Sequence, residues 1–398
     1  MNPTLLARLK APGPKRILSL DGGGIRGSAT LGFLEQIELT VRQRMHANAT
    51  LADYFDLIGG TSTGAIIAAQ LALGHTVAQV KQRFFQFGPE VFSKRTWAAR
   101  LPWIGPKLFT HWSVAPLEKH AKAMLSEKTV LGSPALRTGL CIVTKRADTF
   151  STWPYINHPE GKFYPENADI PLWKLVRASS AAPTYFKPIR LDVGSAGQPD
   201  EGVFVDGGVS MANNPALQLF LVATPQGFPF HWHTGADQLL IVSVGTGRFR
   251  RRLAEKGLMQ SNNLFWARQV PELLMEDASK HTETMLQYLS DSATARPIDW
   301  EMGSLKGDLL GGAPQLSYLR YNTLLDIEPL AAVGIQTTAR ELASLRDMAV
   351  GRNVDKLYNI GVAFAAQQFS AGHLPAVFDP PVVDTTAPAM VPQVSPPA

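Results

Sequence analysis

A serine between two glycines is the first feature of the sequence that could do chemistry. Residues 60–64 read Gly-Thr-Ser-Thr-Gly, which matches the G-x-S-x-G pattern of a nucleophile elbow centred on Ser62. In such an elbow the serine lies on a tight turn between a strand and a helix, and Gly60 and Gly64 leave room for it. The free N–H groups and the dipole at the helix start favour negative charge near the serine oxygen. The alternative is a tight turn that carries an incidental serine.

A glycine-rich run, Gly22-Gly23-Gly24-Ile25-Arg26-Gly27, follows a short apolar segment. It matches the G-x-G-x-x-G fingerprint of dinucleotide-binding folds, which also needs an acidic residue about 20 positions further on. The only acid between positions 38 and 50 is Glu38, within an expected helix. We therefore favour an oxyanion hole, in which consecutive backbone N–H groups face one developing charge. Arg26 either braces this loop, meets a phosphate or faces solvent.

An aspartate also ends an expected strand. Asp206 follows the apolar segment 202–205 and precedes Gly207 and Gly208. The carboxyl ends of parallel strands are where α/β folds collect their active residues, which makes Asp206 a candidate. The alternative is an Asx turn that uses the two glycines.

Two histidines follow Asp206 in the chain order of a Ser–Asp–His triad. His231 and His233 also have an H-x-H spacing that could hint at a metal, but no third ligand cluster lies nearby. They stand in an aromatic, polar segment before an expected strand, so we favour a surface loop.

The segment 248–252 holds four arginines and is the sharpest basic run. Arg250, Arg251 and Arg252 are candidate contacts for a lipid head group or for a phosphate-bearing regulator. The alternative is a solvated loop. A second aromatic and basic segment, 97–112, is a candidate cap or interfacial lid.

The elements that must position these residues alternate between strands and helices. Apolar segments predict strands at 16–20, 54–58, 138–144, 202–205 and 239–244, and periodic patterns predict helices at 27–45, 65–73, 77–87, 114–125, 172–180, 264–289 and 337–369. Strand, glycine turn and helix follow one another twice, which predicts a parallel α/β sheet.

Composition excludes several classes of protein. Among 398 residues, 45% are hydrophobic and 18% charged, which excludes wholesale disorder, and one cysteine excludes a disulfide framework or a multi-cysteine metal site. The longest apolar run, 65–73, is about half the ~20 residues of a membrane span. Residues 1–16 lack the apolar core of a secretory signal. We expect a cytoplasmic protein without metal or cofactor, and a net charge of +5 gives no sign of a nucleic-acid polymer as partner.

Taken together, the motifs resemble those of the patatin-like phospholipase family, of the bacterial type. The resemblance is carried in order by residues 21–27, 60–64 and 206–208, with supporting blocks at 178–186, 213–215 and 243–247. It implies a three-layer α/β/α fold with a mainly parallel central sheet. It also implies a Ser–Asp dyad without a catalytic histidine, and hydrolysis of lipid acyl esters.

The resemblance assigns a role to each motif. Ser62 is the nucleophile and Asp206 the proton acceptor, and the oxyanion hole is formed by Gly22, Gly23 and Gly24, with Thr63. The remaining motif positions are Gly27, Arg26, Gly60, Gly64, Gly207 and Gly208. A free aspartate has a pKa of about 3.9, so burial under an acyl chain must raise it before Asp206 can act as a base near neutrality.

The resemblance also predicts the organisation and partners of the chain. A patatin-like domain is expected at 15–330, with its motifs in 15–250, an N-terminal extension at 1–14, a C-terminal helical extension at 331–372 and a Pro-rich, disordered tail at 373–398. The expected partner is a phospholipid membrane, contacted transiently at the inner membrane surface. One alternative is an anti-phage effector phospholipase switched on by a cyclic oligonucleotide. Another is a non-catalytic nucleotide-binding module that uses the glycine-rich loop.

Overall fold

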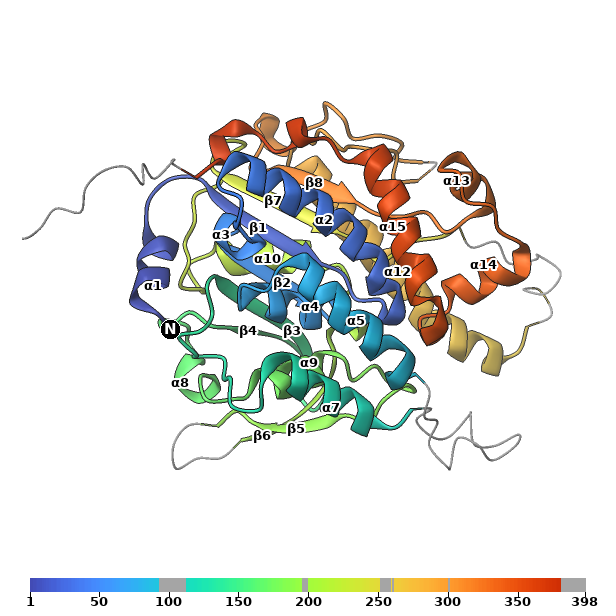
Figure 1. Cartoon of the computed structure of the whole chain (residues 1–398), viewed down its shortest axis with the longest axis horizontal. Coiled ribbons are helices and arrows are strands. Elements are labelled where there is room, and N and C mark those ends of the chain that lie inside the picture. Colours follow the sequence, from blue (N-terminus) through green and yellow to red (C-terminus); the bar gives the residue numbers. More distant parts are fainter. Residues whose placement is uncertain (93–111, 195–199, 251–258, 260, 300, 381–398) are drawn as a thin grey trace, which may run out of the picture.

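The computed structural model describes residues 1–92, 112–194, 200–250, 259, 261–299 and 301–380. These residues form an eight-stranded sheet between two layers of helices (Figure 1). The strand order is β5-β6-β3-β2-β1-β7-β8, and β4 pairs with β3 off this path. The three-layer α/β/α arrangement expected from the sequence is therefore confirmed.

The sheet is parallel in its centre and antiparallel at one side. Its strands are β1 (Lys15–Leu20), β2 (Leu57–Thr61), β3 (Gly139–Arg146), β4 (Ser151–Ile156), β5 (Ile189–Asp192), β6 (Glu201–Asp206), β7 (Leu239–Val244) and β8 (Ser317–Tyr321). Strands β3, β2, β1, β7 and β8 run parallel, whereas β4 and β6 run antiparallel to β3, and β5 antiparallel to β6. Every residue of β1 and β7 is buried because helices cover both faces there.

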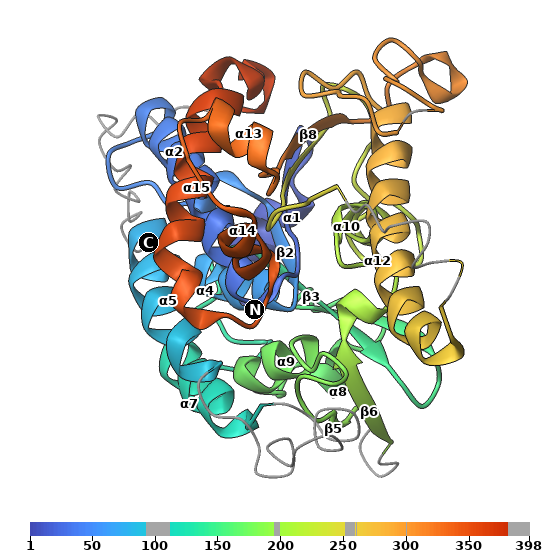
Figure 2. The same ribbon diagram turned by 90° about the vertical axis from the view of Figure 1, so that its right-hand side faces the viewer.

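The helices divide between the two faces of the sheet (Figure 2). One face carries α2 (Gly27–Arg44), α4 (Thr63–Ala72), α5 (Val77–Val91), α7 (Val114–Leu125), α9 (Leu172–Ser179) and α15 (Val354–Gln368), and the other carries α1 (Pro3–Lys10), α10 (Ala216–Ala223) and α12 (Asn263–Tyr288). Shorter helices are α3 (Leu51–Tyr54), α8 (Tyr164–Asn167), α13 (Ile327–Ala332), α14 (Ala339–Arg346), η1 (Gly24–Arg26), η3 (Gly207–Val209), η4 (Leu310–Gly312), η5 (Gly351–Asn353), η6 (Ala371–His373) and η7 (Ala376–Phe378).

Two expected elements differ from the observed ones. The second strand begins at Leu57, because Thr50 and Asp53 form a capping box that holds Tyr54 in the short helix α3. The long helix expected at 337–369 is two helices, α14 and α15, since the backbone at Asp347 is extended.

Helix α15, from the expected C-terminal extension, packs closely on α2. A Cβ at Gly361 would lie 2.1 Å from the Ala29 carbonyl oxygen, and one at Gly32 would lie 2.4 Å from the Val362 nitrogen. The two helices therefore meet through glycines, and α15 is part of the layer that covers the sheet. Within the described ranges, no helix has the length and apolar character needed to cross a membrane.

Candidate active site

Strands β2 and β6 meet end to end along β3, and this brings two motifs together. Strand β4 pairs with all of Cys141–Arg146 along one edge of β3. Strand β6 must therefore pair along the other edge, which β2 occupies as far as Val143. Thr61 pairs with Val143, and Asp206 pairs with the next residue, Thr144. Ser62 and Asp206 thus meet where the two strands end.

Ser62 has the backbone of a nucleophile elbow. Its φ of 54° and ψ of −123° are unusual for a residue with a side chain, and it is the N-cap of α4. The turn is tight, because a Cβ at Gly64 would lie 2.2 Å from the Leu20 carbonyl oxygen and one at Gly60 would lie 2.3 Å from the Gly64 backbone. Only glycine fits at these two positions. The serine is half-buried, so a substrate can reach it.

The Ser62 backbone is held by a side chain from α9. Its N–H donates to the Ser179 Oγ at 2.8 Å, and that hydroxyl donates to the Val143 carbonyl at 2.6 Å. Ser179 is fully buried. It belongs to the block 178–186, for which the sequence offered no role beyond the resemblance.

Asp206 is a buried carboxyl group whose environment suits a base. Burial raises its pKa to about 6, against the hydrogen bonds from the Gly208 N–H and the Ser62 hydroxyl, which lower it. The Gly208 N–H donates to Oδ1 at 2.7 Å and fixes the carboxyl group. Gly207 packs beside β2 and β3, where a Cβ would lie 2.5 Å from the Val143 carbonyl oxygen.

The glycine-rich loop lies directly against Ser62. A Cβ at Gly22 would lie 3.2 Å from the Ser62 Cβ. The Gly22 N–H donates to the Asn213 carbonyl at 3.0 Å, so it is already used and is not available to a substrate. This corrects the expected oxyanion hole, from which Gly22 is removed as a donor. Instead, the Gly22 carbonyl accepts a hydrogen bond from the Thr246 hydroxyl at 2.8 Å.

Three of the four expected oxyanion donors remain. Gly23, Gly24 and Thr63 have backbone N–H groups for which the described part of the chain provides no acceptor. The Thr63 hydroxyl donates to the Gly24 carbonyl at 2.9 Å and so ties the loop to the start of α4. The Thr63 N–H lies at the N-terminus of α4, directly after Ser62, and Gly23 and Gly24 follow Gly22, which contacts the Ser62 side chain. Negative charge is favoured at such a helix start.

A buried ion pair braces the loop from the far side of β1. Arg320, on β8, donates to both carboxylate oxygens of Asp21, at 2.8 and 2.6 Å, and to the Ser243 hydroxyl at 2.8 Å. Arg320 was not predicted from the sequence, because β8 was not among the expected strands. The only signal was a short run of aromatic and branched residues at 317–321.

The other residues singled out from the sequence lie around this centre. The Arg26 guanidinium lies over the Phe249 ring, 5.9 Å from its centroid. A Cβ at Gly27 would lie 2.3 Å from Thr63 Cγ2, so Gly27 allows α2 to approach α4. Arg250 is exposed, and its N–H donates to Asp326. Arg251 and Arg252 lie outside the described residues, as do residues 97–111 of the candidate lid.

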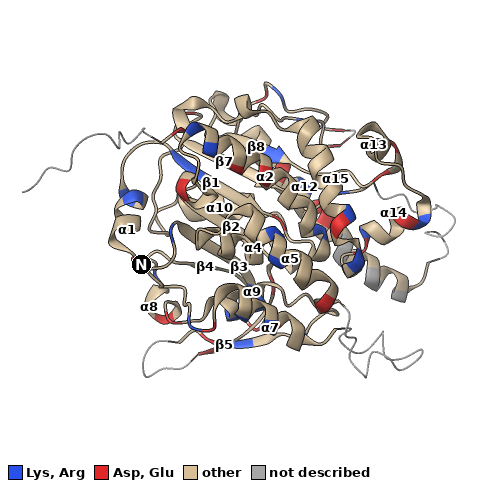
Figure 3. Ribbon diagram, viewed as in Figure 1, with Lys and Arg blue, Asp and Glu red and all other residues tan. Residues whose placement is uncertain are grey.

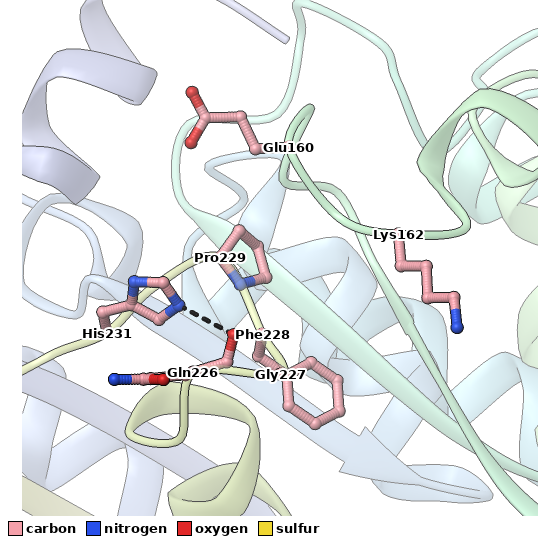
Figure 4. Close-up of a pocket in the computed structure, with 7 residues that line it drawn as sticks. All are labelled: Glu160, Lys162, Gln226, Gly227, Phe228, Pro229 and His231. Carbon is pink, nitrogen blue, oxygen red and sulfur yellow. Dashed lines mark hydrogen bonds between the residues drawn. The ribbon is translucent and has the colours of Figure 1, made fainter.

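The two histidines are remote from Ser62. They precede β7, at the amino edge of the parallel strands, whereas Ser62 follows the carboxyl end of β2. His231 Nε2 lies 3.1 Å from the Gln226 carbonyl oxygen, beside an open hollow of about 250 Å³ lined also by Glu160 and Lys162 (Figure 4). A triad through His231 or His233 is therefore excluded. In the described ranges, no group of three or more His, Cys, Asp or Glu could hold a metal ion.

Comparison with known proteins agrees with this geometry. The family model "Patatin-like phospholipase" matches residues 18–220. Patatin-17 of Solanum cardiophyllum is 30% identical over 247 residues, which are 58% of this chain and 60% of the relative. A cGAMP-activated phospholipase of Escherichia coli (strain TW11681) is 32% identical over 235 residues, 58% of this chain and 62% of the relative.

The chain thus spans about three fifths of the length of these relatives. A solved structure of human GIVD cytosolic phospholipase A2 shares 12% identity at a TM-score of 0.40, covering 94% of this chain and 62% of that one. That score is too low to add to the assignment. The family match covers half of the chain and includes the elbow, the glycine-rich loop and Asp206. The chain belongs to the patatin-like phospholipase family.

Proposed function

We propose that the protein is a serine acyl hydrolase that cleaves ester-linked fatty acyl chains from phospholipids. The observation that carries the proposal is the meeting of Ser62, on a strained elbow, with Asp206, a buried carboxyl group whose pKa is raised to about 6. A pKa near 6 leaves this carboxylate ionised at neutral pH, yet basic enough to accept a proton in the transition state. The phospholipases among the relatives support a lipid substrate.

In the first half of the reaction, the Ser62 Oγ attacks the ester carbonyl carbon, and its proton passes to the Asp206 carboxylate. The negative charge that develops on the carbonyl oxygen is stabilised by the N–H groups of Gly23, Gly24 and Thr63. The intermediate then collapses, the carbon–oxygen bond of the ester breaks, and Asp206 returns the proton to the leaving alcohol. The products are a lysophospholipid and an acyl group bound to Ser62.

In the second half, a water molecule attacks the acyl carbon and gives its proton to Asp206. Collapse of this second intermediate releases the fatty acid and returns the proton to the Ser62 oxygen. The same base and the same oxyanion donors serve both halves.

The proposal is tested by mass spectrometry of lipid extracts incubated with wild-type protein and with Ser62→Ala. We expect free fatty acids and lysophospholipids from the wild type only. Equal amounts of product from both proteins would reject Ser62 as the nucleophile. Cleavage of soluble esters without any product from phospholipids would reject the substrate class.

A second candidate function has a specific observation in its favour. Relatives from Escherichia coli and from Vibrio cholerae, the latter 33% identical over 219 residues, are cGAMP-activated phospholipases. We propose as the alternative that the same hydrolase is an anti-phage effector activated by a cyclic oligonucleotide. Adding cGAMP to purified protein should raise the hydrolysis rate if it holds, and should leave the rate unchanged if the enzyme is constitutive.

The third interpretation, a non-catalytic nucleotide-binding module, is not favoured. A dinucleotide loop presents its N–H groups to a pyrophosphate. Here the Gly22 N–H is taken by Asn213, and the loop packs against the Ser62 side chain.

A further inference from the structure

Five charged residues gather behind the glycine-rich loop, and we call them the arginine cluster. They are Asp21, Arg248, Glu283, Arg296 and Arg320. Basic and acidic residues are distributed over the whole fold, so a local imbalance of charge has to be counted from the contacts of each group (Figure 3).

Four members of the arginine cluster pair with one another. Arg320 holds both oxygens of Asp21, and the Arg296 guanidinium donates to both oxygens of Glu283, at 2.5 and 2.8 Å. The two pairs are linked, because Arg320 Nε lies 3.9 Å from the nearer Glu283 oxygen. The Arg248 guanidinium, by contrast, has no hydrogen bond or ion pair with any residue in the described part of the chain.

The cluster therefore carries three guanidinium groups and two carboxylates, one positive charge in excess. Arg248 is half-buried, and Arg296 repels it more strongly than Glu283 attracts it. Burial and this repulsion lower the pKa of Arg248 to about 10, so it remains charged at neutral pH. A half-buried cation with a full set of unused donors favours an anion beside it.

The position of Arg248 sets what this anion can be. It follows Gly247 at the carboxyl end of β7, two residues after Thr246. The Thr246 hydroxyl bonds to Gly22, whose Cα neighbours the Ser62 side chain. The unpaired cation thus stands just after the strand next to the oxyanion loop, at the same edge of the sheet as the dyad.

We propose that Arg248 is an anion subsite that takes the phosphate group of the substrate, an inference that rests on the proposed phospholipase function. In a phospholipid, only a few bonds separate the phosphodiester from the acyl ester, so both ends can be held at one sheet edge. A guanidinium matches two phosphate oxygens in a fork, which an ammonium cannot do. The competing explanation is that Arg248 is a structural counter-ion of Glu283.

Thermal unfolding separates these two explanations. The variants are Arg248→Gln and, as a control that removes the same charge from an exposed site, Arg340→Gln. Inorganic phosphate, compared with chloride at equal ionic strength, should raise the Tm of the wild type and of Arg340→Gln by a few degrees, since a ligand that binds only the native state stabilises it. Arg248→Gln should not respond.

Without phosphate, Arg248→Gln should unfold at or above the wild-type Tm, because an unpaired charge has been removed. A clearly lower Tm would make Arg248 a counter-ion and overturn the proposal. An equal response of all three proteins to phosphate would overturn it as well.

Kinetics then distinguish a substrate phosphate from a phosphate-bearing regulator. Phosphatidylcholine and diacylglycerol are compared in the same neutral detergent micelles. In Arg248→Gln, the ratio of kcat/KM for phosphatidylcholine to that for diacylglycerol should fall about tenfold or more, as expected for a lost charged hydrogen bond. In Arg340→Gln this ratio should equal that of the wild type.

An unchanged ratio in Arg248→Gln, with the thermal response to phosphate lost, would reject the assignment of Arg248 to the lipid head group. Failure of the wild type to cleave any ester would instead refute the proposed function, and the thermal test would still decide the subsite.

Discussion

The Ser62 N–H and the Ser179 Oγ are joined by a 2.8 Å hydrogen bond, and this bond continues the sheet past its end. The last backbone pair of β2 and β3 joins Thr61 to Val143. Beyond it Ser62 turns to a φ of 54° and leaves the ladder. The Ser179 hydroxyl bridges the gap, accepting from Ser62 and donating to Val143 at 2.6 Å. A strained backbone persists only when its surroundings fix it, and Ser179 is one residue that does so.

Ser179→Ala should therefore lower kcat with little effect on KM. The change leaves one N–H and one carbonyl without a buried partner, which costs about 1–3 kcal/mol of stability and loosens the nucleophile. We expect a kcat loss on the order of 10-fold to 100-fold, since a misplacement of about 1 Å costs up to 10²-fold.

Ser180→Ala is the matched control for this change. Its neighbouring hydroxyl is also buried, but it has no hydrogen-bond partner in the described ranges. Steady-state kinetics on a soluble ester should find Ser180→Ala close to wild type. Equal losses of kcat in the two variants would mean that Ser179 only fills space.

Ser62→Ala and Ser62→Gly should both abolish hydrolysis but differ in stability. Alanine keeps the unfavourable φ of 54°, so its Tm should match the wild type. Glycine adopts that backbone freely, so the change relieves about 1–3 kcal/mol of backbone strain in the folded protein. The greater conformational entropy that glycine loses on folding offsets about 0.5–1 kcal/mol of this, so the free energy of unfolding should rise by about 1 kcal/mol. Thermal unfolding measures the difference, and a Gly variant less stable than the Ala variant would contradict the strain.

A fluorophosphonate probe provides the matching chemical readout. It should label the wild type at Ser62 and fail to label either variant. Labelling of another serine, with activity kept in Ser62→Ala, would overturn the nucleophile assignment.

The raised pKa of Asp206 predicts opposite pH effects on activity and stability. Because the carboxylate is the base, kcat/KM should rise with pH and reach half of its plateau near pH 6. The folded protein binds this proton more tightly than the unfolded chain does. The stability from protonated Asp206 is therefore complete below the ordinary pKa of 3.8 and is lost as pH rises through about 6.

Asp206→Asn should accordingly lose orders of magnitude in turnover and gain stability above pH 6. The amide oxygen can still accept from the Gly208 N–H, and it carries no charge to bury. The shift from 3.8 to about 6 corresponds to an advantage on the order of 2–3 kcal/mol that shrinks towards pH 4. Urea unfolding of both proteins from pH 4 to 8 measures this difference in the free energy of unfolding. A difference that grows towards low pH would contradict the raised pKa of Asp206.

The parallel centre of the sheet could be predicted from the sequence, but its antiparallel side could not. β1 and β7 are largely apolar runs that end in glycine turns, a pattern typical of parallel strands buried on both faces. β4 and β5 are short and half-exposed, and β4 contains Pro154, so neither forms such a run. The junction of β2 with β6 depends on β4 filling the other edge of β3, which is a property of the whole sheet.

The same distinction applies to the candidate site. Ser62, Asp206 and the glycine-rich loop stand in local motifs whose residue types already state their chemistry. Ser179, Arg320 and Arg248 act through partners more than 30 positions away, and nothing in their own neighbourhoods points to those partners. The use of the Gly22 N–H by Asn213 was equally invisible, because both residues belong to separate motifs.

His231→Ala and His233→Ala should leave turnover within about twofold of the wild type, as for surface substitutions outside the site. Both residues lie at the sheet edge opposite to Ser62, and His231 faces the hollow beside Gln226 (Figure 4). The same soluble-ester assay as for Asp206→Asn makes the comparison direct. If either histidine variant were as inactive as Asp206→Asn, a dyad could not be the whole machinery.

Gly23→Ala should reduce kcat/KM by at least the roughly 10²–10³-fold that one lost oxyanion donor costs. A Cβ at Gly23 would lie 2.1 Å from the Thr246 Oγ1 and 2.6 Å from its Cβ, so the loop must move and carry its N–H groups away from the oxyanion. Gly227→Ala is the control, because nothing lies within 4 Å of a Cβ there, and it should stay active.

The double variant Gly23→Ala, Thr246→Gly removes the clash and should regain activity relative to Gly23→Ala alone, although it loses the hydrogen bond from Thr246 to Gly22. Full activity in Gly23→Ala would show that the loop donors are not needed, and lost nucleotide binding in that active variant would restore the dinucleotide interpretation.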